Sequence, residues 1–387
     1  MYSFDKDIQT LKDEGLYREM RYLEAAQGSH TFIDGRDMLL MSSNSYLGLS
    51  NDIRLKEAAI SAINKFGIGA GGSRLTTGSY LLHKELEEKL AEFKGTESCI
   101  VFSTGYAANI GTISGITDKD WIVFCDRLNH ASIVDAIRLS GAKLVVYKHC
   151  DIEDLQNKIK RYHTGKGLIV TDGVFSMDGD IAPLFEIVEL AKKHKLMTMV
   201  DDAHATGILG ECGKGTIEYF GLKEDIDINM GTLSKAFAGE GGFVAGRKEL
   251  IDFLRHKAKS FIYSTAPAPH IVAVALEALN IIRTEPGTRK DLKEKVIWFR
   301  EKLIKNGFNV TMNITPIIPL MIGDSKTALI LSKILFDEGI FIPAIRPPTV
   351  PNGTSRLRIS IMATHTYEDM EHTIEKLVRF GKELKLI

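Results

Sequence analysis

The chain has 387 residues, a formal net charge of -1, 44% hydrophobic and 26% charged residues, and 34 glycines. This composition is typical of a globular α/β protein; it excludes a fibrous or disordered chain, and the balanced charge argues against a nucleic-acid partner. The 4 cysteines form no C-x-x-C pair and have no paired histidine spacing, so we expect no metal site and a reducing, cytoplasmic location.

The first 24 residues have the pattern of a charged amphipathic helix, which is unlike a signal peptide. We expect a helix and strand segment over residues 1–45. Residues 54–66 and 81–95 then predict two amphipathic helices around a glycine-rich turn, "GIGAGG" (Gly67 to Gly72). This turn matches the dinucleotide fingerprint G-x-G-x-x-G, but no strand leads into it, so the pattern favours close approach of a ligand or partner subunit instead.

Residues 46–270 predict a large domain in which near-continuous apolar runs alternate with helical patterns. Such runs indicate a mostly parallel sheet covered by helices on both faces, which is an α/β fold. The expected strands are "SCIVFS" (98–103), "WIVFCD" (121–126), "KLVVYKH" (143–149), "GLIVTDG" (167–173), "LMTMVDD" (196–202) and "DIDINMG" (225–231). Ligands bind at the carboxyl ends of such strands, where Asp126, Asp172, Asp201 and Thr232 fall.

Residues 271–387 predict a smaller α+β domain, which the N-terminal segment joins. Long helical patterns cover residues 271–285 and 290–307, and short strands are expected at "IIPLMIG" (317–323) and "RLRISIM" (356–362). A last helix ends near Leu384.

Three motifs in the large domain suggest a bound ligand. Lys235 in "NMGTLSKAFAGEGG" stands among small residues and is either a solvated loop lysine or a lysine that meets a ligand. Gly105 in "STGYAAN" ends a strand and begins a helix, which suits a phosphate but is equally compatible with a plain tight turn. His130 in "DRLNHAS" follows a strand, where its ring either stacks on a flat cofactor or caps the next helix.

Two further motifs narrow the ligand to one cofactor. "VDDAHATG" places Asp201 and His204 after an apolar strand, and "TDGVFSMDGDIAPL" carries Ser176 on a glycine-flanked loop. A phosphate site, a lysine and a strand-end acid together predict pyridoxal 5'-phosphate (PLP). This cofactor needs a lysine Schiff base, for which we expect Lys235, and an acid facing its pyridine nitrogen, for which we expect Asp201.

These motifs resemble those of the α-oxoamine synthases among the fold-type I PLP transferases, over residues 15 to 380. The same resemblance extends to three further stretches, "SSNSYLGLS", "GIGAGGSRLTTGSYLLHKELE" and "IRPPTVPNGTSRLRISIMATHT". The resemblance implies a homodimer with shared active sites. It also implies residue roles: stacking by His130; contacts near the ring hydroxyl by His204 and Ser176; phosphate binding by Gly105, Tyr106, Thr232 and, from the partner subunit, Thr265; and substrate binding by Asn44, Thr349, Arg358 and either Arg18 or Arg21.

Within this family, "AIRPPTVPNGTSRLR" and "VDDAHATG" are most similar to the biotin-pathway branch. That similarity implies a decarboxylative condensation of L-alanine with pimeloyl-CoA or a pimeloyl carrier protein. Lys235 would remove the Cα proton, and His130 and His204 would assist the carbonyl steps. The alternative is the glycine C-acetyltransferase branch, which uses glycine and acetyl-CoA.

Overall fold

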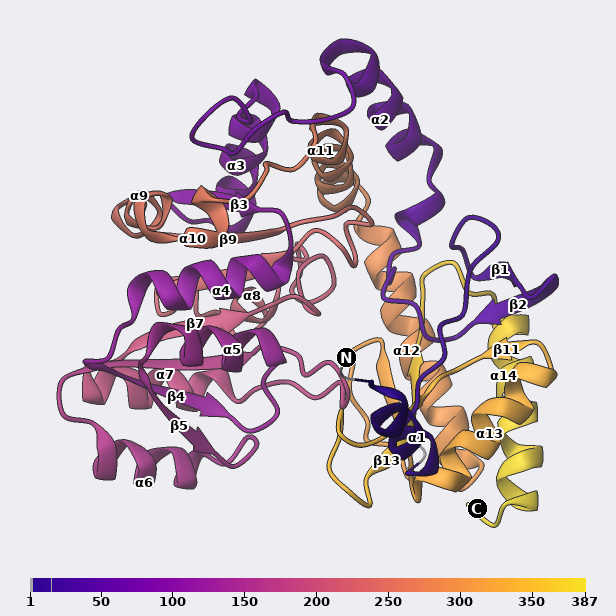
Figure 1. Cartoon of the computed structure of the whole chain (residues 1–387). Coiled ribbons are helices and arrows are strands. Elements are labelled where there is room, and N and C mark those ends of the chain that lie inside the picture. Colours follow the sequence, from indigo (N-terminus) through magenta and orange to yellow (C-terminus); the bar gives the residue numbers. More distant parts are fainter. Residues whose placement is uncertain (1–2, 15) are drawn as a thin grey trace.

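The computed structural model describes residues 3–14 and 16–387 and consists of two parts that lie side by side (Figure 1). The larger part is built on a seven-stranded sheet in the order β3-β9-β8-β7-β6-β4-β5. The strands are β3 (Ser98–Phe102), β4 (Trp121–Asp126), β5 (Lys143–Tyr147), β6 (Lys166–Asp172), β7 (Met197–Asp201), β8 (Ile228–Thr232) and β9 (Gly242–Gly246). All the strands expected in this part of the sequence are present, and the fold class is confirmed.

Strand β9 was not expected, and it makes the sheet mixed. It pairs antiparallel with both β3 and β8 and is buried along its whole length. Gly242 in this strand has no room for a side chain, since a Cβ there would lie 2.6 Å from the Cα of Gly105. Glycine therefore allows the backbone of β9 to approach the turn after β3 closely.

Both faces of the sheet are covered, as the apolar strands predict. On β6, Leu168 and Val170 join one core cluster while Ile169 joins another. The first cluster is completed by α4 (Gly105–Ile116), α5 (Ala131–Ser140), α9 (Lys248–Lys257) and α10 (Lys259–Ile262). The second is completed by α6 (Ile152–Tyr162), α7 (Leu184–His194) and α8 (Thr216–Tyr219).

A third layer covers the β3 side of the sheet. It contains α2 (Ile53–Phe66), which follows the short 3-10 helix η1 (Leu49–Asn51), together with α3 (Leu81–Lys94) and α11 (Pro269–Thr284); α11 packs against both α2 and α3. The glycine-rich turn follows helix α2 rather than a strand, so it is not a dinucleotide site. Beside it, Ser73 forms a bridge with Thr265, and the N–H of Ala266 donates to the carbonyl of Gly72 at 3.0 Å.

The smaller part contains two short sheets and the C-terminal helices. One sheet has the order β10-β13-β12 and the other β1-β2-β11. The elements are β1 (His30–Ile33), β2 (Arg36–Leu40), α12 (Pro286–Lys305), β10 (Ile317–Gly323), α13 (Ser325–Asp337), β11 (Ile340–Phe341), β12 (Ala344–Ile345), β13 (Ser355–Ser360) and α14 (Tyr367–Glu383). Because β2 pairs with β11, the N-terminal segment joins this part, as expected. The expected domain bounds stay a prediction.

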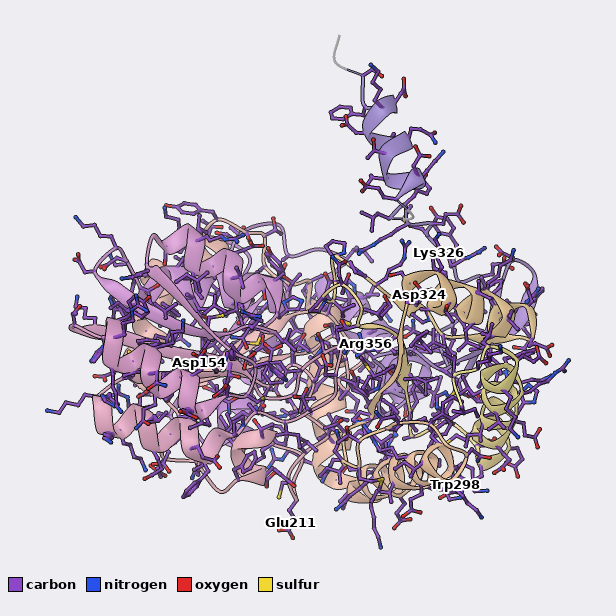
Figure 2. All side chains as sticks on the ribbon, turned by 90° about the horizontal axis from the view of Figure 1, so that it is seen from below. Asp154, Glu211, Trp298, Asp324, Lys326 and Arg356 are labelled. Atoms are coloured by element: carbon purple, nitrogen blue, oxygen red, sulfur yellow. The ribbon has the colours of Figure 1, made fainter. Side chains whose placement is uncertain are left out.

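The N-terminal helix is shorter than the sequence pattern suggested. Helix α1 (Asp5–Asp13) ends before the motif around Arg18, and the N–H groups of Leu16 and Tyr17 both donate to the carbonyl of Leu11. Met1, Tyr2 and Gly15, which the helical pattern included, lie outside the described residues. Helix α1 buries none of its side chains and projects from the body (Figure 2).

No helix among residues 3–14 and 16–387 combines the length and apolar character that crossing a bilayer requires.

Candidate active site

A cavity of about 200 Å³ opens at the carboxyl ends of β6, β7 and β8. It is lined by seven of the residues expected from the sequence: Gly105, Tyr106, His130, Asp201, His204, Thr232 and Lys235. These residues come from four separate turns, and the sheet brings them together because its parallel strands end at one edge. Asn109, Ser132 and Asp172 also line the cavity.

Asp201 is the last residue of β7 and is 4% exposed. Its Oδ2 accepts a hydrogen bond from Nδ2 of Asn109 at 2.7 Å, and its Oδ1 accepts one from the N–H of Ala203 at 2.9 Å. Two donors on a buried carboxylate fix its orientation. Asn109 lies in the motif "STGYAAN", from which no role was expected for it.

Asp172 is the register partner of Asp201 on the neighbouring strand β6. Burial and the nearby Asp201 carboxylate raise the pKa of Asp172 well above its ordinary value. Asp172 therefore takes up a proton more readily than an exposed aspartate does.

Lys235 lies in the turn between β8 and β9. The N–H of Leu233 donates to the carbonyl of Gly241 at 3.0 Å, and the N–H of Ala238 donates to that of Lys235 at 2.9 Å, which closes the turn. Burial in the cavity wall lowers the pKa of Lys235, although the carboxylates of Asp201 and Asp172 act in the opposite direction. A lowered pKa increases the fraction of neutral amine, the form that acts as a nucleophile or base.

His130 fulfils one of the two roles left open by the sequence, and its stacking on a cofactor stays a prediction. It is the N-cap of α5, where its ring accepts from the N–H of Ser132 at 3.3 Å, and its ring also lines the cavity. Its Nδ1 lies 2.7 Å from Oγ of Ser132, and burial lowers its pKa. Ser132 in turn accepts from Nδ2 of Asn109 at 2.8 Å, so one chain of hydrogen bonds links His130 to Asp201.

His204 connects the cavity to the smaller part of the molecule through Tyr46. Nδ1 of His204 lies 2.7 Å from the hydroxyl of Tyr46, and that hydroxyl accepts from Nη2 of Arg358 at 3.3 Å. Burial lowers the pKa of His204 well below its ordinary value, and the positive charges of Lys235 and Arg358 act in the same direction. His204 is therefore a neutral hydrogen-bonding group. Tyr46 is fully buried, and no role was expected for it from the sequence.

Arg358 on β13 is held by four hydrogen bonds. Its Nε donates to the carbonyl of Ser176 at 2.5 Å, its Nη1 to Oγ of Ser360 at 2.9 Å, and its Nη2 to Oδ1 of Asn44 at 3.0 Å and to Tyr46. Asn44, Ser176 and Arg358 do not line the cavity itself. They form a cluster that joins it through Tyr46 and His204.

The opposite end of the cavity is the start of α4. Thr104 caps this helix by accepting from the N–H of Ala107 at 2.9 Å, and the next residue is Gly105. A Cβ at Gly105 would lie 3.3 Å from Oγ1 of Thr232, so glycine keeps the space above the first turn open. Free N–H groups at a helix start favour an anion.

Three expected site residues lie elsewhere. Arg18 and Thr349 are both exposed and hydrogen-bond each other at 2.9 Å, away from the cavity lining. Thr265 is exposed and also does not line the cavity of its own chain. Arg21, the alternative to Arg18, pairs with Asp34 and stacks over the ring of Phe336.

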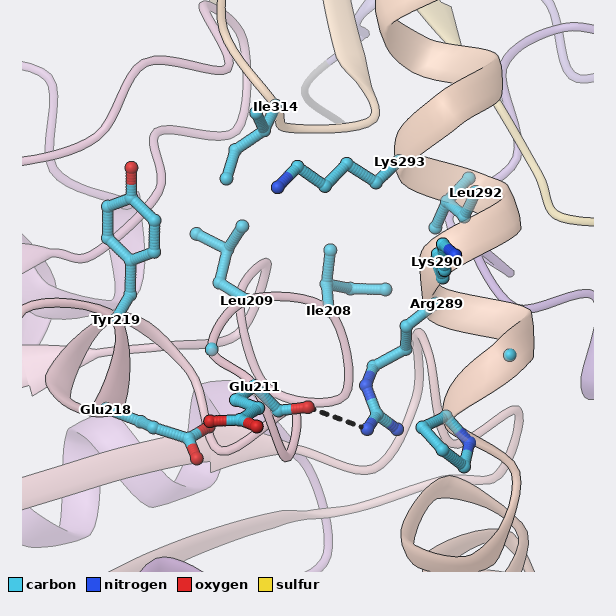
Figure 3. Close-up of a pocket in the computed structure, with 13 residues that line it drawn as sticks. Ile208, Leu209, Glu211, Glu218, Tyr219, Arg289, Lys290, Leu292, Lys293 and Ile314 are labelled. Atoms are coloured by element: carbon cyan, nitrogen blue, oxygen red, sulfur yellow. Dashed lines mark hydrogen bonds between the residues drawn. The ribbon is translucent and has the colours of Figure 1, made fainter.

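A larger hollow of about 650 Å³ lies between α12 and the loop before α8 (Figure 3). It is lined by cations and acids together, and Arg289 in its wall already donates to the carbonyls of Ile282 and Glu211. None of the expected cofactor or substrate residues lies there. The 200 Å³ cavity is the better candidate because its polar groups converge.

Comparison with known proteins agrees with this geometry. The model of the family "Aminotransferase class I and II" matches residues 36–377. The chain belongs to this family. It is 71% identical to a putative 8-amino-7-oxononanoate synthase of Acetivibrio thermocellus over 100% of both chains, and 51% identical to the 8-amino-7-oxononanoate synthase of Lysinibacillus sphaericus over 99% of both. The solved serine palmitoyltransferase of S. paucimobilis with bound PLP and myriocin is 34% identical, with a TM-score of 0.94, covering 99% of this chain and 98% of that one. Within the family, the chain is an α-oxoamine synthase of fold type I, as the motifs implied.

Proposed function

We propose that this chain is a PLP-dependent acyltransferase that condenses L-alanine with a pimeloyl thioester, giving 8-amino-7-oxononanoate, CO2 and the free thiol in biotin biosynthesis. The observation that carries the proposal is the convergence of Lys235 and Asp201 in one cavity. The names of the relatives at 71% and 51% identity support this reaction over others of the family.

The residues present fit PLP. Lys235 supplies an amine with a lowered pKa, which suits a Schiff base, and Asp201 supplies a buried carboxylate with a fixed orientation. Gly105 and Thr232 leave space at a helix start for a phosphate, and the ring of His130 forms part of the wall between these ends.

When bound, PLP supplies a ring that accepts electrons from the carbon next to the amino group of alanine. Asp201 would hold the ring nitrogen through its carboxylate and would stabilise a proton there. Nζ of Lys235 takes the proton from Cα of alanine, a role that its lowered pKa favours because more of the amine is neutral. After CO2 leaves, the same nitrogen returns a proton to that carbon.

Arg358 receives the carboxylate of alanine. Its guanidinium has five N–H groups, and four are engaged with neutral acceptors, so a carboxylate that binds through two bonds replaces one of them. Asn44 accepts from the same guanidinium, and Arg18 and Thr349, which hydrogen-bond each other away from the cavity lining, stay expected substrate contacts. His204 donates a hydrogen bond to the thioester carbonyl oxygen as negative charge develops there.

The proposal includes a cytoplasmic homodimer in which Thr265 of one chain completes the phosphate site of the other. Support comes from the exposure of Thr265 and from its bridge to Ser73, which holds the segment firmly beside the glycine-rich turn. Dimers with a two-fold axis are the commonest oligomers, so each chain would complete the other's site in the same way.

The experiment is a substrate comparison with the purified enzyme. Alanine with pimeloyl-CoA should release CO2 and thiol in equal amounts, and glycine with acetyl-CoA should be at least ten times slower in kcat/KM. The reverse preference would contradict the proposal and favour glycine C-acetyltransferase. A pimeloyl carrier protein tested in parallel determines which thioester is the better donor.

A further inference from the structure

A second polar cluster lies at the same edge of the sheet but outside the cavity, beyond the carboxyl ends of β4, β5 and β6. Nε2 of His149 lies 2.6 Å from Oδ2 of Asp180 and 3.7 Å from Sγ of Cys150, and Sγ of Cys150 lies 3.9 Å from the same Oδ2. Three different donor atoms therefore lie within 3.9 Å of one another. None of them takes part in the proposed reaction.

We propose that His149, Cys150 and Asp180 form a binding site for one zinc ion, with Asp126 supporting the histidine. Zn–S bonds of about 2.3 Å and Zn–N or Zn–O bonds of about 2.0 Å place tetrahedral ligands roughly 3.3–3.5 Å apart. The two sulfur distances are within about 0.5 Å of that spacing. The Nε2–Oδ2 distance is that of a hydrogen bond, and it lengthens when the ion replaces the shared proton.

Asp126 is placed to orient the histidine. Its Oδ1 lies 3.0 Å from Nδ1 of His149, the ring nitrogen that faces away from the donor set, and also accepts from the N–H of Leu128. Its Oδ2 accepts from the N–H of Cys150 at 2.8 Å. A carboxylate behind a metal-binding histidine fixes the ring and its tautomer, and Asp126 is in that position.

Two further observations point to a ligand at this cluster. Oδ1 of Asp180, the second oxygen of the carboxylate that would bind the ion through Oδ2, is buried and has no hydrogen-bond partner among the described residues. Cys150 has a positive φ of 51°, a conformation that few residues other than glycine adopt, and this backbone brings its thiol beside His149. Thiolate, imidazole and carboxylate together favour Zn²⁺ over Mg²⁺ or Ca²⁺.

Binding exchanges one zinc ion for two protons. Zn²⁺ forms bonds to Nε2, Sγ and Oδ2, while the thiol proton and the proton between Nε2 and Oδ2 pass to solvent. The side chain of Asp180 is 36% exposed, so water can reach the fourth position.

The ion would fix a loop that serves the active site. Asp180 lies in the loop between Val174 and Ile181, which bridge each other, and the ring of Phe175 meets the His149 ring edge-on at 4.4 Å. The carbonyl of Ser176 in this loop accepts from Arg358. Zinc would thus hold this loop against the ends of β4 and β5.

The test uses the PLP-loaded enzyme after dialysis against a chelator, with Co²⁺ as the probe. We expect one Co²⁺ per chain and visible d–d bands of tetrahedral strength at wavelengths longer than the cofactor absorbs, both displaced by Zn²⁺. Cys150→Ser and Asp180→Asn should weaken binding at least tenfold. Cys212→Ser, which changes an exposed cysteine elsewhere, should bind as the wild type does. No stoichiometric Co²⁺ binding, or an unchanged spectrum in Cys150→Ser, would overturn the proposal.

Thermal unfolding separates loss of the site from loss of the fold. With Zn²⁺ at about one hundred times its Kd, the wild type and Cys212→Ser should gain roughly 3 °C in Tm. Cys150→Ser should unfold cooperatively in chelator and gain nothing. A gain in Cys150→Ser equal to that of the wild type would contradict the site even if Co²⁺ bound.

Discussion

Asn109 offers the sharpest test of the active-site geometry. Its Nδ2 donates to Asp201 at 2.7 Å and to Ser132 at 2.8 Å, and the side chain is 1% exposed. Asn109→Ala removes a hydrogen bond to a charged group, which contributes about 1.5–3 kcal/mol. If the whole of this stabilisation supports proton removal from alanine, the rate falls roughly 10- to 160-fold, at 1.36 kcal/mol per factor of ten.

The assay is exchange of the alanine Cα proton for deuterium, followed by NMR in the absence of thioester. This readout isolates the step in which Asp201 acts, and the KM for alanine should change little because Arg358 is untouched. Asn109→Asp should be slower still, since it places a second carboxylate beside Asp201. Ser114→Ala is the matched control on the same helix, because Oγ of Ser114 donates to the carbonyl of Ile110 in its own helix and to no other group among the described residues. Wild-type exchange in Asn109→Ala, with cofactor bound, would refute the reasoning.

Three further predictions follow from the same site. Lys235→Ala should lose the covalent, borohydride-reducible attachment of PLP and nearly all turnover; a labelled peptide elsewhere in the chain would reassign the lysine. Burial lowers the pKa of His204, so below pH about 6.5 the unfolded chain binds more protons and the free energy of unfolding falls as the pH falls. Denaturant titrations at pH 7 and 5.5 should show a smaller loss for His204→Gln, and an equal loss would argue against a neutral buried His204. Heterodimers of Thr265→Ala and Lys235→Ala chains should contain one fully active site if Thr265 acts on the partner, whereas two impaired sites would place Thr265 in its own chain's site.

The parallel strands were predictable because each is an apolar run closed by a polar or glycine residue, and burial on both faces requires such runs. The sequence did not predict strand β9 because "GFVAG" continues a glycine-rich motif and has a glycine at each end. Its glycines reflect the space left by the turn at Gly105, which no local pattern encodes. The sequence predicted a longer N-terminal helix than the structure has, because the amphipathic pattern of charged and apolar residues continues past Asp13.

The site was predictable where a residue type itself signals chemistry, as for Lys235 and Asp201. Asn109 and Tyr46 carry no such signal, since an amide in a helix and a tyrosine in a turn are common, and their importance comes from what they bond. Likewise His149 and Asp180 are far apart in the chain and meet only because β5 and β6 flank β4.

The hydroxyl of Tyr46 has one proton and three neighbours: His204, Asn44 and Arg358. Arg358 can only donate, so the hydroxyl proton goes either to Nδ1 of His204 or to Oδ1 of Asn44. If it goes to His204, the neutral ring carries its own hydrogen on Nε2 and offers a donor. If it goes to Asn44, Nδ1 of His204 must donate to the hydroxyl instead, and Nε2 becomes an acceptor. Only the first arrangement gives Nε2 the hydrogen that the thioester carbonyl oxygen would accept. The direction of one hydroxyl proton thereby sets the hydrogen-bonding polarity of the imidazole without any movement of the backbone.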